Sequence, residues 1–168
     1  DMAIMAPVHP LLHRTPILIA GPEASQALPQ LEMLGMQARV AGSRVGEASA
    51  IKMVRSVLIK GIEAVTAECM LAARRAGVEG AVLASLERSD PKVDWAARSA
   101  YNIERMTTHG KRRAAELREV VATLDELGLP SRMAAATAEW EDQLGSLDLK
   151  LREESLFERL DHVLSALE

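Results

Sequence analysis

The first part of the chain alternates short apolar runs with turn residues. Residues 3–8 (AIMAPV) and 15–21 (TPILIAG) are rich in apolar and β-branched side chains and end near proline or glycine, a pattern that predicts strands. Residues 21–35 have a helical pattern in which Pro29 introduces a break or a kink, and residues 37–42 (QARVAG) predict a third strand. The order strand, strand, helix, strand is typical of the end of a larger sheet.

The rest of the chain has helical periodicity throughout. Residues 46–76 contain no proline and predict a single helix of unusual length, which Gly77 ends. Proline at position 91 suits the first turn of a later helix. The further helices that we expect are at residues 78–89, 91–108, 110–128, 129–145 and 146–168.

These patterns predict a mainly α protein in two parts. Residues 1–44 form the terminal strands and helix of a sheet, and residues 45–168 form an all-α domain. Because Asp1 lies inside a predicted strand, we expect the chain to be a fragment, a processed product or an engineered truncation that lacks an upstream region.

Composition narrows the function classes. The chain has 168 residues, of which 48% are apolar and 2% aromatic, and its net charge is −4. A negative net charge with so few aromatic residues argues against a nucleic-acid-binding protein. The single cysteine, Cys69, excludes an intrachain disulfide and a cysteine-based zinc site, and we expect no metal. No signal peptide or membrane-length apolar run is visible, so we expect a cytoplasmic protein without a membrane partner.

One lysine stands out in the stretch RVGEASAIKMVRS. The small residues Gly46, Ala48 and Ser49 precede Lys52, and Ser56 follows one helical turn later. Small residues allow a ligand to approach the helix closely, and Lys52 would then donate a proton or a hydrogen bond to a bound oxygen. The alternative is a solvated lysine on a long helix, which the local pattern by itself favours.

The same stretch resembles the signature G-x-G-x-x-x-K-x-x-x-N of the β-hydroxyacid dehydrogenase superfamily. That superfamily includes 3-hydroxyisobutyrate and 6-phosphogluconate dehydrogenases, and the chain is most similar to a bacterial branch of its NAD(P)-dependent oxidoreductases. Gly46 and Lys52 match, Ala48 replaces the second glycine, and Ser56 replaces the asparagine. The resemblance implies that Lys52 is the catalytic acid/base, that Ser56 and Ser49 bind substrate, and that Gly46 and Ala48 lie near the cofactor.

A second resemblance lies at the start of the chain. With Asp1 aligned to the family's D-A-P-V-S-G-G, the S-G-G element that binds substrate carboxylate becomes Met5-Ala6-Pro7. These three are the predicted substrate-binding positions, although a hydroxyl and two glycines are lost. Pro7 also has no N–H for an anion, which argues against a standard small hydroxyacid substrate.

A third resemblance concerns the cofactor side. The family's K-D-L corresponds to residues 115–117 (AEL), so its lysine is absent here. Arg112, with Lys111 and Arg113 beside it, lies about a turn earlier and is our candidate to replace it. The alternative is that these three residues form a solvated helix start. Lys60, two turns beyond the signature lysine, is expected to be solvated or structural.

The resemblance implies a helical domain like the C-terminal domain of 6-phosphogluconate dehydrogenase, preceded by a remnant of a Rossmann domain. The dinucleotide fingerprint G-x-G-x-x-G does not occur in the chain, so we expect NAD or NADP to bind the full-length protein and not this chain.

Two functions remain open. The first is the C-terminal substrate and dimerisation domain of an NAD(P)-dependent oxidoreductase acting on a hydroxyacid-like or related small substrate, inactive without an N-terminal cofactor domain. The second is a non-enzymatic helical dimerisation module that keeps the fold. For both we expect a homodimer or higher oligomer formed through helices.

Overall fold

The computed structural model describes residues 1–151 and 154–168 and divides into two compact units, residues 1–56 and 57–168. One long helix, α2 (Glu47–Arg75), contributes to both. The boundary predicted from the sequence, between residues 44 and 45, lies inside the first unit, since the first turns of α2 pack with the strands. Each unit is described by itself.

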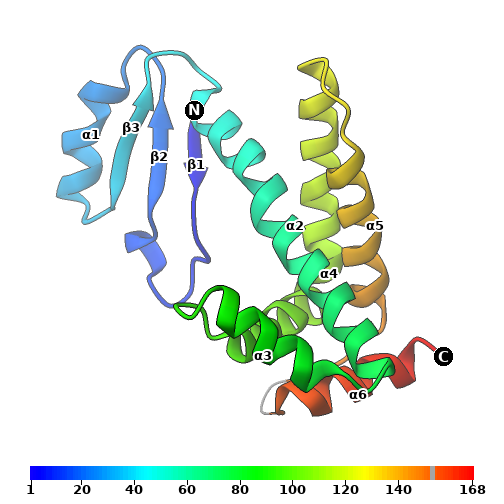
Figure 1. Cartoon of the computed structure of the whole chain (residues 1–168). Helices are drawn as coiled ribbons and strands as arrows, with labels where there is room; N and C mark the ends of the chain where they lie inside the picture. The colour runs from blue at the N-terminus through cyan, green and yellow to red at the C-terminus, as the bar shows by residue number, and fades with distance from the viewer. Residues whose placement is uncertain (152–153) are drawn as a thin grey trace. The chain divides into compact units, whose positions relative to one another are not determined.

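The first unit contains a three-stranded sheet with the order β1-β2-β3. Strand β1 (Met2–Ile4) is antiparallel to β2 (Ile17–Ala20), and β2 is parallel to β3 (Ala38–Gly42). Helix α1 (Ala24–Met33) makes the crossover between β2 and β3 (Figure 1). The predicted order of strand, strand, helix and strand is confirmed, and Pro29 lies within α1 without ending it.

Both faces of this sheet are used in packing. Because side chains alternate along a strand, Ile17 and Ile19 of β2 pack on the side of α1, whereas Ala3 and Ala20 form a separate buried cluster with Ala48 of α2. Ala48 is completely buried. The first turn of α2 is therefore fixed against the sheet.

The second unit is helical. The predicted unbroken helix over residues 46–76 is confirmed as α2, which has 29 residues, and Gly77 follows it with a positive φ of 68°. Buried side chains from all the helices form one core, which includes Met70, Ile103, Leu144 and Leu160. The other helices are α3 (Glu79–Ser89), α4 (Trp95–Glu126), α5 (Arg132–Ser146) and α6 (Leu156–Ala166). In the part of the chain that the structure describes, no helix is long and apolar enough to cross a membrane.

The predicted break between two helices near Gly110 is wrong. Residues 95–126 form one helix of 32 residues. Gly110 lies where α4 crosses α5, and a Cβ built on it would be 2.1 Å from the carbonyl oxygen of Glu141 and 2.8 Å from the Cα of Gly145. This glycine is explained by the close approach of two backbones and not by a turn.

The prediction of one final helix over residues 146–168 is also wrong. Helix α6 begins only at Leu156, after a capping box in which the side chain of Ser155 and that of Glu158 each accept from the other's backbone N–H. Leu151 is buried but lies outside the helix. Residues 152–153 lie outside the described residues.

We expect Gly110→Ala to lower the free energy of unfolding by about 1–3 kcal/mol, the usual cost of overpacking, because α4 and α5 must separate to admit the methyl group. Gly80→Ala in α3 is the matched control, since a Cβ there meets nothing within 4 Å. In the control the better helix propensity of alanine should stabilise the protein slightly. Urea unfolding of both variants measures the difference, and equal midpoints would contradict this account of the crossing.

Candidate functional site

The start of α2 is capped from a distant point in the sequence. Oδ2 of Asp1 accepts hydrogen bonds from the backbone N–H groups of Gly46 (3.0 Å), Ala48 (3.0 Å) and Ser49 (3.2 Å). Its Oδ1 accepts from the Ser49 hydroxyl at 2.6 Å. A carboxylate at this place satisfies otherwise unpaired donors and interacts favourably with the helix dipole.

This cap gives the small residues before Lys52 a structural role. Gly46 has a φ of +99°, a conformation that only glycine adopts readily, so its role in forming the turn is clear. The amides of Gly46 and Ala48, which would be the obvious donors to a cofactor phosphate, are already bonded to Asp1. Their predicted contact with cofactor stays a prediction, and the structure shows them holding the start of the helix.

Lys52 is exposed on α2, one turn beyond the capped residues. In the part of the chain that the structure describes, no ion pair or hydrogen bond engages its ammonium group. The Ser56 hydroxyl donates to the Lys52 carbonyl oxygen at 2.9 Å, so its proton is already used, although its oxygen can still accept. Lys52 thus lies on a helix whose first turn is held by Asp1, and its role as the catalytic acid/base stays a prediction.

The predicted substrate-binding segment Met5-Ala6-Pro7 follows β1. Met5 packs on the buried cluster that includes Ala48, and its N–H donates to the Pro16 carbonyl oxygen at 2.9 Å. Ala6 is half-buried and Pro7 is exposed. The structure thus connects Met5 with the start of α2 through packing, while a role for the segment in substrate binding stays a prediction.

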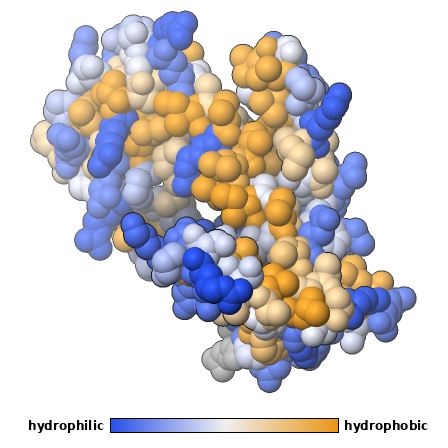
Figure 2. Space-filling model, in the orientation of Figure 1, coloured by the Kyte–Doolittle hydropathy of each residue, from blue (hydrophilic) through white to orange (hydrophobic). Residues whose placement is uncertain are grey.

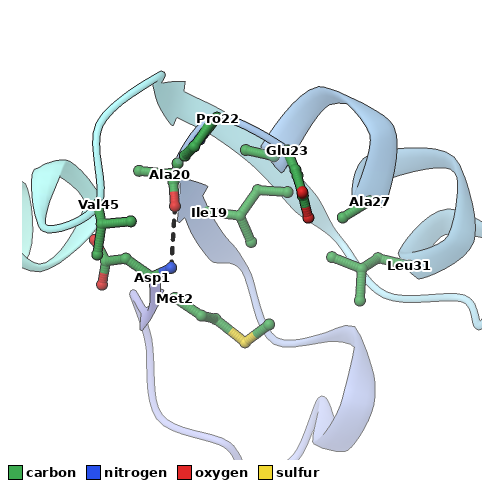
Figure 3. Close-up of a pocket in the computed structure, with 11 residues that line it drawn as sticks. Asp1, Met2, Ile19, Ala20, Pro22, Glu23, Ala27, Leu31 and Val45 are labelled. Atoms are coloured by element: carbon green, nitrogen blue, oxygen red, sulfur yellow. Dashed lines mark hydrogen bonds between the residues drawn. The ribbon is translucent and has the colours of Figure 1, made fainter.

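A pocket in the first unit was not indicated by the sequence. It has a volume of about 440 Å³ and lies on the side of the sheet that carries α1. Figure 3 shows Met2, Ile19 and Leu31 around it, with Glu23 at one side and the α-amino group of Asp1 donating to the Ala20 carbonyl oxygen. Lys52 is not among its lining residues. The sequence did not predict this pocket because it does not show that Met2 pairs with Ile19 across the sheet.

The cationic residues of the second unit separate into exposed and buried groups. Arg112 is exposed and pairs with Glu116 one turn later. Arg113 is only 4% exposed and pairs with two buried carboxylates, Glu63 of α2 and Glu141 of α5. A solvated helix start is therefore the wrong interpretation for Arg113, because the unbroken α4 directs it into the core. Binding of cofactor by Arg112 stays a prediction.

Lys60 is not solvated either. It is 5% exposed, and its Nζ donates to Oε2 of Glu116 at 2.8 Å, so of the two expected roles the structural one holds. Burial lowers the pKa of Lys60 even though Glu116 favours its charged form. Burial likewise raises the pKa of Glu141 in spite of the neighbouring Arg113. These groups join α2, α4 and α5 in a charged core.

Among residues 1–151 and 154–168, no three His, Cys, Asp or Glu side chains are grouped so that they could hold a metal ion.

Comparison with known proteins gives one family match and several relatives. Residues 73–144 match a family described as a domain of unknown function (DUF1932). An uncharacterised 28.5 kDa protein in the 7S RNA 5′ region of Methanothermus fervidus is 35% identical over 75 residues, which cover 45% of this chain and 30% of that protein.

Two solved structures resemble nearly the whole chain. A conserved hypothetical protein from Sinorhizobium meliloti 1021 has a TM-score of 0.83 and 33% identity, covering 98% of this chain and 56% of its own. The conserved protein MTH1747, described as structurally similar to 3-hydroxyacid dehydrogenases, has a TM-score of 0.77 and 32% identity, covering 87% of this chain and 55% of its own. The chain thus spans little more than half of these two proteins and less than a third of the Methanothermus relative.

Proposed function

We propose that this chain, which is a β-hydroxyacid dehydrogenase-like C-terminal domain, supplies the substrate side of an NAD(P)-dependent oxidoreductase acting on a hydroxyacid-like or related small molecule. The observation that carries the proposal is Lys52, exposed on a helix whose first turn is fixed by Asp1 and by burial of Ala48. MTH1747 is described as similar to 3-hydroxyacid dehydrogenases, which supports the same chemistry.

The residues of this chain do not themselves fit a dinucleotide. At the start of α2, the backbone N–H groups of Gly46, Ala48 and Ser49 could bind a phosphate, but they already donate to Asp1. In the proposal the dinucleotide, which exchanges a hydride with substrate carbon, is held by an upstream domain. The part left to this chain is the proton: an alcohol that becomes a carbonyl loses a proton from its oxygen, and a carbonyl that is reduced gains one. In the proposal Lys52 exchanges that proton.

A second candidate function is a helical dimerisation module without chemistry. Two observations favour it. The predicted carboxylate-binding segment has no hydroxyl and ends in Pro7, and the hydroxyl proton of Ser56 is used within α2. Both features reduce the number of donors available to a substrate near Lys52.

Calorimetric titration with NADH and NADPH, followed by assays on a panel of hydroxyacids, separates the two. We expect the 168-residue chain to bind neither dinucleotide, and a longer form that includes the upstream domain to bind one and oxidise a member of the panel. Binding by the 168-residue chain would show that the cofactor site has been misplaced. A folded longer form that binds neither dinucleotide would favour the dimerisation module.

A further inference from the structure

The loop that connects β1 to β2 exposes apolar side chains. It spans residues 5–16 and lies at one end of the sheet (Figure 1). Val8 is 46% exposed, Leu11 39% and Leu12 53%. Ile4, at the end of β1, is exposed as well, and Figure 2 shows hydrophobic surface over the strands of this unit. Such exposed apolar surface is typical of a place where a ligand or a partner binds.

The loop is ordered by local hydrogen bonds. The hydroxyl of the buried Thr15 donates to the carbonyl oxygen of Leu12 at 2.7 Å and lies 3.2 Å from that of Val8. The backbone N–H of Leu12 donates to the same Val8 oxygen at 2.6 Å. Leu12 has a φ of 52°, a left-handed conformation that leucine rarely adopts. Since Leu12 is also exposed, neither backbone preference nor burial explains a leucine at this position, whereas contact with a ligand does.

The loop starts beside the helical turn that carries Lys52. Its first residue, Met5, packs on the buried cluster that includes Ala48 of α2. Lys52 follows Ala48 by four residues and therefore lies on the same face of the helix. Both the loop and Lys52 belong to the first unit. A molecule bound at Lys52 thus has the start of this loop as its neighbour.

The charge of this region favours an anion. Residues 2–22 contain no aspartate or glutamate, while the loop carries His9, His13 and Arg14. Arg14 is exposed, and in the part of the chain that the structure describes no ion pair or hydrogen bond engages its guanidinium group. A cation beside apolar side chains complements a small molecule that has both an acid group and an apolar group.

We propose that this loop is the specificity-determining wall of the substrate site, at which Leu11 and Leu12 contact an alkyl or aryl group of the substrate and Arg14 pairs with its acid group. The substrate class is then a hydroxyacid with a large apolar substituent. A side chain binds the acid group, which fits the loss of a hydroxyl and two glycines at residues 5–7. The inference rests on the proposed oxidoreductase function and narrows its substrate.

A substitution that suits the backbone of the loop tests the apolar contact. In a longer form that includes the upstream domain, we expect a higher kcat/KM for 3-hydroxy-3-phenylpropionate than for 3-hydroxypropionate. Leu12→Asn should lower the first value by about tenfold or more and leave the second unchanged, because a lost apolar contact weakens only the substrate that makes it. The urea midpoint should not fall, since asparagine adopts the left-handed conformation more readily than leucine. Leu34→Asn, at a leucine of the same unit that is 68% exposed at the end of α1, is the matched control and should leave the ratio of the two values unchanged.

The acid group is tested separately. We expect Arg14→Gln to raise KM for both acids by a similar factor, because both carry the same carboxylate and the substitution removes only its cation. Arg39→Gln is the matched control, since Arg39 is an exposed arginine on β3 of the same unit. Equal KM values for the two variants would show that Arg14 does not bind the acid group.

Failure of the loop inference and failure of the oxidoreductase proposal give different results. If the longer form oxidises these acids but prefers the smaller one, or Leu12→Asn leaves the ratio unchanged, the loop inference is wrong and the oxidoreductase stands. If it oxidises neither acid, calorimetric titration with 3-hydroxy-3-phenylpropionate decides. Binding that Leu12→Asn weakens supports the loop as an apolar subsite without the proposed chemistry. No binding, or binding that the substitution leaves unchanged, overturns the inference.

Discussion

Replacing Lys52 by alanine is expected to lower kcat by about a hundred- to ten-thousand-fold, the usual contribution of a general acid or base. The assay requires a form of the protein that carries a cofactor-binding domain. The affinity for NADH or NADPH should hardly change, because in the proposal that domain holds the dinucleotide. Ser56→Ala should have a smaller effect, mainly on KM, because the serine hydroxyl is bonded to the Lys52 carbonyl oxygen.

Two control variants sharpen this experiment. Arg55→Ala removes another exposed cation from the same turns of α2 and should leave kcat nearly unchanged. Lys52→Arg keeps the charge, but a guanidinium does not give up its proton near neutral pH, so turnover should stay low. Lys60, which the sequence suggested as an internal control, is unsuitable because it is buried and paired with Glu116. If Lys52→Ala and Arg55→Ala have the same kcat, Lys52 is a surface residue and the catalytic proposal is wrong.

The second large effect concerns stability. Arg113→Met is expected to lower the free energy of unfolding by about 3–5 kcal/mol, because it leaves the buried carboxylates of Glu63 and Glu141 without their cation. Glu141 has no exposed surface, so water cannot replace the lost interaction. Urea unfolding near neutral pH measures this loss.

Arg118→Met is the matched control. Arg118 also connects α4 to α5 through an ion pair, with Asp142, but both side chains are exposed, so the loss should be about 1 kcal/mol or less. If Arg113→Met costs no more than this control, the buried network does not hold the helices together.

The effect of Arg113→Met should also depend on pH. Burial raises the pKa of Glu141, so the folded state binds its proton more readily than the unfolded state does. The contribution of this group to stability therefore increases as the pH falls through its raised pKa towards 4.5. Without Arg113 that pKa should rise further, and the loss caused by the substitution should shrink in acid. A loss that is the same at neutral and acidic pH would contradict this explanation.

The sequence alone determined the parts of this protein that depend on local patterns. Short apolar runs that end near proline or glycine predicted the first two strands, and local patterns also predicted the third strand and the helix before it. The uninterrupted periodicity of residues 46–76 predicted α2. Lys52 was singled out by the small residues before it and by the family signature. Such features require only neighbours along the chain, because helix and strand periods are set by backbone geometry.

Tertiary structure alone decided the features that involve distant residues. Gly110 has the local appearance of a helix break, and only its contact with α5 shows that it allows two backbones to meet. Lys60 and Arg113 are of residue types that usually lie in solvent. Here both are buried, and carboxylates from other helices compensate for their burial. Asp1 caps a helix that starts forty-six residues later along the chain. Burial and pairing are properties of the packed molecule, and a pattern read along one segment contains no information about the segment that will pack against it.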